Sequence, residues 1–420
     1  MIETQQYGDF AVGLYSKVHE LRLPLNGTIE VTNRCPLTCA HCYNNLPMND
    51  HHARRAELTL EDHKRIVDEL AELGCMWLLY TGGEIFARAD FLDIYAHARS
   101  RGFIIVLFTN GTMITERIAD YLVANPPFDI EITLYGATKE TYDALTGIPG
   151  SYELCMRGIR LLLQRNLPLK LKTVATSINV HEIPAMQQMA DELGVSFKFD
   201  PMINPRIDCS ASPLEVRLTP VEVVALDLDT PSRVVEWRRL ATDLSTAPPE
   251  PGNEPLYECG GGVNSFAIDP YGDLSICVLS HVDRYNVKQG SVREGWETYL
   301  RGVRDRRATR ITKCTMCALK SLCGSCTANR ELENGDPEKP VDFLCRTAHL
   351  RASVFDVDVP PHGDCEYCSD GSRHGELLEM VDEVHARRGA DVDAIRRAPL
   401  PPPSASACGS GGCGSCSLTK

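Results

Sequence analysis

The chain alternates, from Ile29 to Asp200, between short apolar runs and longer segments whose apolar residues recur with helical spacing. In the first of the longer segments Ile66, Leu70 and Leu73 share one face, which predicts an amphipathic helix. Strands that alternate with such helices form parallel sheets with right-handed crossovers, so the pattern predicts an α/β fold with six parallel strands. The expected strands are Thr28 to Val31, Met76 to Tyr80, Ile104 to Phe108, Ile130 to Leu134, Leu169 to Ala175 and Ser196 to Asp200.

Local signals set the ends of several helices. Thr59 followed by Asp62 is a capping-box pattern, and Gly74 is expected to cap the other end of that helix. Farther along, the stretch from Ser265 to Cys277 predicts a hairpin around a Pro-Tyr-Gly-Asp turn. The other expected helices are Phe91 to Arg99, Ile114 to Val123, Tyr152 to Gln164, Ile183 to Leu193, Pro220 to Leu226 and Gly375 to Arg388.

Polar or small residues stand where the expected strands end. Gly82, Gly83 and Glu84 follow the second strand, and glycines at such a place allow the backbone to approach a ligand closely. Parallel barrels put ligand groups at the carboxyl ends of their strands, so further polar residues there are candidate contacts. These further candidates are Asn110, Thr133 and Ser177, and for each the alternative is a polar residue that caps a loop.

Composition and charge narrow the class of protein. The chain has 420 residues, of which 43% are hydrophobic and 24% charged, an ordinary balance for a globular protein with several units. A formal charge of −14 argues against binding to nucleic acid. No apolar run approaches the roughly 20 residues that span a bilayer, and Met1 to Phe10 lacks the pattern of an export signal. We therefore expect a cytoplasmic protein without a membrane segment.

The 18 cysteines change the picture, because many of them cluster at metal-binding spacings in a large chain without an export signal. That pattern favours metal ligation in a reducing compartment over disulfides. Cys35, Cys39 and Cys42 form a CxxxCxxC run just after the first strand. Three thiolates on one loop hold three irons of a 4Fe–4S cluster and leave the fourth iron open for a small molecule. A zinc loop or a set of unrelated thiols is the alternative.

The CxxxCxxC run, followed one strand later by Gly82-Gly83-Glu84, resembles the radical SAM enzymes. The resemblance implies a partial (β/α)6 TIM-like barrel whose cluster binds S-adenosylmethionine and cleaves it to a 5'-deoxyadenosyl radical. It also implies a reductant such as flavodoxin or ferredoxin. One departure is Thr146, where many relatives carry an arginine before the glycine that matches Gly147. The cofactor contacts implied by the resemblance are His41, Gly82, Gly83, Glu84, Asn110, Thr133 and Ser177.

A second set of cysteines resembles the SPASM extension, which carries two auxiliary 4Fe–4S clusters, so three clusters are implied in all. By position, one auxiliary cluster is held by four thiolates and the other by three, which leaves an iron open for substrate. A zinc knuckle is the alternative for Cys314 to Cys326, and the spacing before Cys326 is one residue shorter than usual. The first set is Cys314, Cys317, Cys323 and Cys345, and the second is Cys259, Cys277 and Cys326.

The end of the chain has five more cysteines. Cys365 and Cys368 form a further CxxC, whereas the other three lie in a Gly/Ser-rich stretch after a proline run, a composition typical of a flexible arm. Three interpretations stay open: a mobile metal- or persulfide-binding arm, a contribution of Cys365 and Cys368 to a cluster, or a tail that resembles a fused peptide substrate. The three tail cysteines are Cys408, Cys413 and Cys416.

The function implied by the resemblance is modification of a ribosomally made peptide by hydrogen abstraction, giving a thioether or carbon–carbon crosslink. Maturation of a haem- or quinone-type cofactor precursor is the first alternative, and a non-catalytic iron–sulfur electron carrier is the second. Val278 stands where sulfatase-maturing relatives carry an aspartate, which disfavours formylglycine formation. The expected parts are an N-terminal segment (1–27), the barrel (28–200), a linker region (201–256), the SPASM domain (257–350) and a C-terminal extension (351–420).

Overall fold

The computed structural model describes residues 16–242 and 254–388, and the tail cysteines Cys408, Cys413 and Cys416 lie outside them. The chain divides into two compact units. We call Ser16–Arg217 together with Gly260–Arg304 the barrel unit, and the described residues of 218–259 and 305–420 the cysteine unit. None of the described helices has the length and apolarity needed to cross a membrane.

A curved sheet of nine strands forms the barrel unit, in the order β11-β10-β9-β1-β4-β5-β6-β7-β8. The six strands from β1 to β8 in this order are parallel, which confirms the predicted α/β architecture. Their bounds are β1 Asn26–Glu30, β4 Trp77–Thr81, β5 Ile104–Thr109, β6 Asp129–Thr133, β7 Leu169–Val174 and β8 Ser196–Asp200. Short β2 (Arg34–Cys35) and β3 (Leu46–Pro47) pair with each other outside this sheet.

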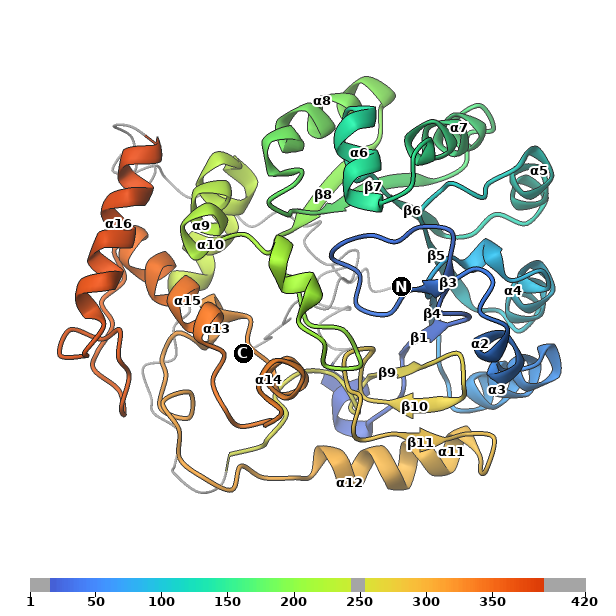
Figure 1. Ribbon diagram of the computed structural model, residues 1–420. Coiled ribbons are helices and arrows are strands. Elements are labelled where there is room, and N and C mark those ends of the chain that lie inside the picture. Colours follow the sequence, from blue (N-terminus) through green and yellow to red (C-terminus); the bar gives the residue numbers. More distant parts are fainter. Residues whose placement is uncertain (1–15, 243–253, 389–420) are drawn as a thin grey trace, which may run out of the picture. The chain divides into compact units, whose positions relative to one another are not determined.

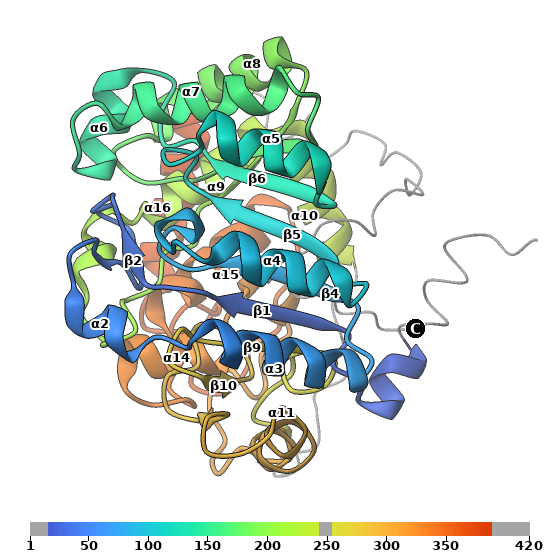
Figure 2. The same cartoon turned by 90° about the vertical axis from the view of Figure 1, so that its right-hand side faces the viewer.

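Helices cover the outer face of the sheet, as Figures 1 and 2 show for α3, α4 and α5. Side chains that point to the helices, such as Leu78 and Leu107, are fully buried, whereas the alternate positions are partly exposed. Thr59 and Asp62 form the predicted capping box of α3. The helices of this unit are α2 His51–Ala56, α3 Leu60–Glu72, α4 Phe91–Ser100, α5 Glu116–Ala124, α6 Lys139–Thr146, α7 Ser151–Leu163, α8 Ile183–Leu193, α11 Val292–Glu294 and α12 Arg301–Arg304, with a π-helical turn at Gly295–Leu300. Single 3-10 turns occupy Ile85–Ala87, Val180–Glu182 and Ser212–Val216.

The predicted hairpin is present, and it extends the barrel sheet. Strand β9 (Ser265–Ile268) pairs antiparallel with β10 (Asp273–Ser275), which pairs in turn with β11 (Tyr285–Asn286). Strand β9 also lies parallel to β1, so a segment expected inside the auxiliary domain adds strands beside the first strand of the barrel. The domain boundaries drawn from the sequence remain predictions.

The cysteine unit is helical. Helices α9 (Pro220–Asp229), α15 (Asp342–Val354) and α16 (His374–Arg388) pack around a core that includes Val224, Leu350 and Val384. The buried Arg351 donates to Asp227 at 2.9 Å and so joins α15 to α9. The other helices are α10 Pro231–Thr242, α13 Lys320–Cys323 and α14 Thr327–Asn334.

Candidate active site

The first cysteine of the CxxxCxxC run is held by a buried ion pair. Arg34, immediately before Cys35, donates from Nε and Nη2 to the two carboxylate oxygens of Glu57, at 2.9 and 3.0 Å. The hydroxyl of Thr32 donates to the same carboxylate at 2.5 Å. A bidentate arginine–carboxylate pair fixes direction as well as distance, so the loop leaves β1 along a defined path.

The three thiols of this loop lie within electrostatic reach of one another, Cys35 buried and Cys39 and Cys42 half-buried. Burial raises the pKa of Cys35 to about 12. The pKa of Cys39 is also raised, first by burial and then by the negative charges of Cys42 and Cys35, which lie within electrostatic reach. The backbone amide of Cys42 donates to the carbonyl of Cys39 at 3.0 Å and closes a turn between them. Such buried thiols become thiolates only with a cationic partner, which a bound metal supplies.

Gly82 and Gly83 pack directly on the backbone of the cysteine loop. The amide of Gly83 donates to the carbonyl of Thr32 at 2.6 Å, and the amide of Glu84 donates to that of Arg34 at 3.0 Å. A Cβ at Gly82 would stand 2.2 Å from the Thr32 carbonyl oxygen, and one at Gly83 would stand 2.5 Å from the Arg34 carbonyl oxygen. Both positions therefore require glycine, and Gly82 also adopts a φ of 138°.

The carboxylate of Glu84 joins this motif to the end of β5. It accepts hydrogen bonds from the Thr109 hydroxyl at 2.7 Å, the Asn110 amide at 2.8 Å and the Phe86 amide at 3.1 Å. Burial raises the pKa of Glu84, and these hydrogen bonds counter the shift. Because the Glu84 carboxylate is engaged in hydrogen bonds within the protein, it fixes the position of the two glycines relative to Asn110.

Two of the expected strand-end contacts lie apart from this network. Thr133 ends β6 and is half-buried, and Ser177 is exposed, its amide donating to the Val216 carbonyl at 3.0 Å. Among the described residues, no hydrogen bond joins either side chain to the cysteine loop. Their assignment as cofactor contacts stays a prediction.

Tyr135 was missed by the sequence reasoning. It lies just beyond β6 and close enough to Cys39 to lower the pKa of that thiol, against the larger effect of burial, which raises it. Its ring centroid is 5.3 Å from that of His41, whose pKa burial lowers to about 4. The Nδ1 atom of His41 has no hydrogen-bond partner within the described ranges. The signal for Tyr135 was its place after a strand end, the same place that drew attention to Gly82 and Asn110.

Helix α6, also not predicted, closes the other side of the loop. The amide of Thr38 donates to the carbonyl of Thr146 at 2.9 Å, and the amide of Ala40 donates to that of Leu145 at 3.0 Å. At the next residue, Gly147, a Cβ would stand 2.4 Å from the Thr38 hydroxyl oxygen, so glycine is required there. Thr146 thus contacts the cysteine loop through its main-chain carbonyl, a contact that does not depend on the identity of its side chain.

The last residues of the loop are tied to β1. Glu30 accepts hydrogen bonds from the Tyr43 hydroxyl at 2.7 Å and from the Asn44 side-chain amide at 2.6 Å. Burial, the largest effect on this carboxyl, raises the pKa of Glu30 to about 7. The loop is therefore fastened at its start by Glu57 and at its end by Glu30.

Charged side chains also project from neighbouring strands on the side away from the helices. Glu131 of β6 contacts the ammonium groups of Lys172 and Lys198, at 3.2 and 3.0 Å. The Lys172 ammonium lies 2.7 Å from the centroid of the Phe108 ring. Burial lowers the pKa of Lys172 to about 7, while Glu131 partly opposes the shift. A lysine in this state loses its charge near neutral pH.

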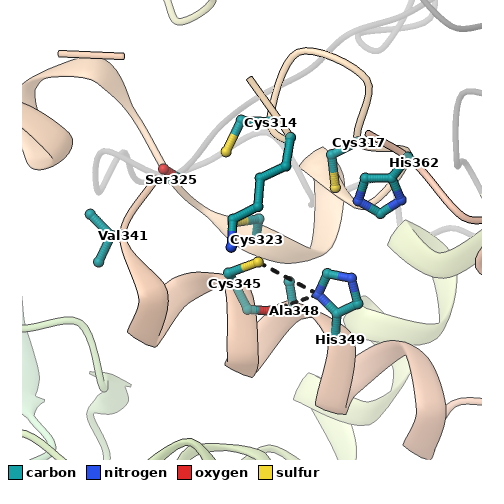
Figure 3. A pocket seen from close by; sticks show the side chains of 10 residues that line it. Cys314, Cys317, Cys323, Ser325, Val341, Cys345, Ala348, His349 and His362 are labelled. Atoms are coloured by element: carbon teal, nitrogen blue, oxygen red, sulfur yellow. Dashed lines mark hydrogen bonds between the residues drawn. The ribbon is translucent and has the colours of Figure 1, made fainter. Parts of the chain in front are cut away.

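Four of the auxiliary cysteines meet in the cysteine unit (Figure 3). Cys314, Cys317, Cys323 and Cys345 line one small cavity, with His349 and His362 at its edge. Burial raises the pKa of Cys323 to about 12, with Cys314 and Cys317 adding to the shift. These four are the thiols that the sequence grouped into one cluster site.

The other auxiliary set is placed only in part. Cys259 and Cys326 belong to the cysteine unit, where burial raises the pKa of Cys326 and the charge of Cys259 adds to the shift. Cys277 belongs to the barrel unit, so convergence of all three stays a prediction. The cysteines of the described residues are free thiols.

Comparison with known proteins identifies the class of protein. Residues 29–190 match the Radical SAM superfamily model, so this stretch is a radical SAM domain and the protein is an enzyme, as its motifs predicted. Radical SAM domains use S-adenosylmethionine and a 4Fe–4S cluster.

Two curated relatives match over most of their length. The chain is 26% identical to an AdoMet-dependent heme synthase of Methanosarcina barkeri over 325 residues, which is 73% of this chain and 92% of the relative. It is also 26% identical to the mycofactocin maturase MftC of Mycobacterium tuberculosis over 400 residues, 91% of this chain and 92% of the relative.

Among solved structures, SuiB of Streptococcus suis bound to the precursor peptide SuiA shares the fold. The TM-score is 0.61 at 16% identity, over 82% of each chain. The likeness supports the partial-barrel architecture predicted from the sequence.

Proposed function

We propose that this enzyme is a maturase that modifies a ribosomally made peptide by hydrogen abstraction, with the cluster held by Cys35, Cys39 and Cys42. The carrying observation is that one loop holds these three thiols and packs against Gly82 and Gly83 through main-chain hydrogen bonds. When bound, the cluster and S-adenosylmethionine together supply a one-electron cleavage that generates a hydrogen-abstracting radical.

The residues present fit this pair of groups. Cys35 is buried, Cys39 and Cys42 are half-buried and lie within electrostatic reach of it, and the two glycines let the cysteine loop pack directly on their backbone. Nδ1 of His41 lacks a partner in the described part of the chain. In the proposal, the backbone of Gly82 and Gly83 receives the methionyl amine. Glu84 holds that backbone in place, and Asn110 orients the Cys35 sulfur. His41, Thr133 and Ser177 complete the proposed cofactor contacts.

A peptide substrate is supported by the extent of the match to MftC, which spans nearly the whole of both chains. The shared fold with SuiB is compatible with it. Val278, in place of the aspartate of sulfatase-maturing relatives, favours crosslinking over formylglycine formation. We expect a thioether or carbon–carbon bond as the product.

A second candidate is chemistry on a haem-type precursor. It is favoured by the match to the AdoMet-dependent heme synthase, which covers 92% of that relative. Incubation of the reduced enzyme with either a candidate precursor peptide or an iron porphyrin separates the two. A mass change of the peptide alone supports the first candidate, and a change of the porphyrin alone replaces it with the second.

Two auxiliary clusters belong to the proposal, one on Cys314, Cys317, Cys323 and Cys345, the other on Cys259, Cys277 and Cys326. The first of these is supported by the cavity that its four cysteines line, since four converging thiolates suit a cubane cluster. A flavodoxin- or ferredoxin-type reductant is the expected electron source.

Anaerobic reconstitution tests the assignment of the clusters. Three cubanes correspond to about twelve irons per chain, and the enzyme should form 5'-deoxyadenosine with dithionite as reductant. A Cys39→Ala variant should lose about four irons and all cleavage, while Cys209→Ala, at an exposed cysteine, should keep both. Cleavage by Cys39→Ala would refute the assignment of the first cluster, and about four irons in the wild type would remove the auxiliary clusters.

A further inference from the structure

Beside the cavity of the four auxiliary cysteines, the loop between α15 and α16 and the adjoining face of α15 carry a second group of buried metal-binding side chains. Cys365 and Cys368 are 5% exposed, and His362 of the same loop and His349 of α15 are 8% and 2% exposed. One ligand atom from each of the four residues lies within 4.8 Å of every other. The sequence reasoning singled out only the CxxC pair: it overlooked His362, three residues before Cys365, and His349 stands 16 residues before Cys365.

The separations match those around a single tetrahedral ion. The Cys365 sulfur lies 3.3 Å from Nε2 of His349, and the Cys368 sulfur lies 3.9 Å from the same nitrogen. The Cys368 sulfur is also 3.3 Å from Nδ1 of His362. Zinc bonds of about 2.3 Å to sulfur and 2.0 Å to nitrogen place neighbouring tetrahedral ligands roughly 3.5 Å apart.

The histidine rings are oriented for ligation. Nδ1 of His349 lies 2.8 Å from the carbonyl oxygen of Cys345, so a proton on that nitrogen leaves Nε2 free to face the two sulfurs. The two imidazole rings stack at an angle of 20°, with centroids 5.7 Å apart. Nδ1 of His362 also lies 3.1 Å from the Pro360 carbonyl oxygen. On metal binding this nitrogen would lose its proton and bond to the metal instead of to that carbonyl.

The loop is built to hold its cysteines in place. Gly371 donates from its amide to the carbonyl of Cys368 at 2.8 Å, and the buried Tyr367 donates from its hydroxyl to Asp342 at 2.6 Å. Cys365, Tyr367 and Cys368 belong to the apolar core between α9, α15 and α16. Such a closed, water-excluded set is typical of a structural metal site.

Iron–sulfur occupancy fits the four residues less well. Although His349 and His362 also border the cavity of Cys314, Cys317, Cys323 and Cys345, that cavity already offers four thiolates for a cubane. A two-iron centre with two cysteines and two histidines binds the two kinds of ligand to different irons. The 3.3 Å separations between sulfur and nitrogen instead suit ligands of one shared ion.

We propose that His349, His362, Cys365 and Cys368 bind one Zn²⁺ that fastens the loop after α15 to the core of the cysteine unit. Because His349 and Cys345 lie one turn apart on α15, the same ion fixes the helix face that presents Cys345 to the neighbouring cavity.

Metal analysis and X-ray absorption at the zinc edge on the full chain test this site without reference to catalysis. The purified wild type, grown with added zinc, should hold one zinc with a first shell of two sulfurs and two nitrogens. Cys368→Ser should lose the zinc, and Cys209→Ser should keep it. Cys368→His, which retains a ligand, should keep the ion with one sulfur and three nitrogens.

Two results overturn the proposal. The first is wild-type protein without zinc, or with iron at this site by Mössbauer counting. The second is a zinc shell that stays unchanged in Cys368→His, since the ion would then lie elsewhere. Should Cys368→Ser fail to fold, the wild-type and Cys368→His spectra decide the question alone.

Discussion

The side-chain amide of Asn110 donates to the sulfur of Cys35 at 3.4 Å, across 75 residues of sequence. Its direction is fixed from the other side, since Oδ1 of Asn110 accepts from the amide of Thr112 at 2.9 Å and from its hydroxyl at 2.6 Å. The end of β5 thereby touches a proposed cluster ligand. Hydrogen bonds to cluster sulfurs tune reduction potential, so this contact has a chemical consequence.

We predict that Asn110→Asp slows cleavage of S-adenosylmethionine by about 10- to 100-fold, the usual effect of losing a partner of a metal ligand. A carboxylate at this position cannot donate to the sulfur, and its charge disfavours electron uptake by the cluster. Single-turnover formation of 5'-deoxyadenosine and the cluster potential report the change. Asn125→Asp, at the end of α5, is the control, and wild-type values in Asn110→Asp would contradict the role of the contact.

Gly83→Ala should prevent stable assembly of the first cluster. The new Cβ would stand 2.5 Å from main-chain oxygens that cannot move without displacing the Cys35 loop, a strain of about 1–3 kcal/mol or more. Gly302→Ala, in α12, meets no atom within 4 Å and serves as the matched control. The iron content and the temperature of thermal unfolding should both be lower in Gly83→Ala and unchanged in Gly302→Ala. Full iron content in Gly83→Ala would show that the loop tolerates the displacement.

Glu57→Ala should destabilise the barrel unit by about 3–5 kcal/mol, because it leaves the buried Arg34 without its carboxylate. The side chains of Arg34 and Glu57 are only 6% and 5% exposed. Glu61→Ala breaks an exposed pair with Lys64 and should cost less than about 1 kcal/mol. Urea unfolding measures the loss in the free energy of unfolding for each variant. Equal losses would mean that the buried pair stabilises the protein no more than the exposed pair does.

Lys172 should titrate near neutral pH. Its pKa, lowered to about 7 mainly by burial, lies below that of an unfolded lysine, so the unfolded chain binds more protons between these values. This group therefore makes the protein more stable as pH rises from about 7 toward the ordinary lysine value of about 10.4. Glu131→Gln removes the charge that opposes the shift and should lower the pKa further.

NMR of ¹³C-methylated lysines measures this titration directly. One resonance should move near pH 7 in the wild type and at lower pH in Glu131→Gln. A spectrum in which every lysine titrates near 10.4 would contradict the buried state of Lys172.

Periodicity and motif spacing were enough to predict most of the strands and helices of the barrel. The six parallel strands, the capping box of Thr59 and the hairpin around Gly272 are local features, because each depends on residues close in sequence. Tyr135 and helix α6 were not predicted, because their importance comes from contact with the cysteine loop and not from a sequence pattern of their own. His349 was missed for the same reason, whereas His362 stands three residues before Cys365 and was overlooked.

The sequence by itself determined the alternation of strand and helix, the grouping of cysteines and the class of chemistry, because periodicity and ligand spacing are properties of a local chain. Only the tertiary structure decided that β9 pairs with β1 and that the Glu84 carboxylate accepts hydrogen bonds from Thr109 and Asn110. It also decided that two histidines lie beside Cys365 and Cys368. Such pairings depend on which buried polar groups can satisfy one another once distant segments pack, and no short-range pattern encodes them.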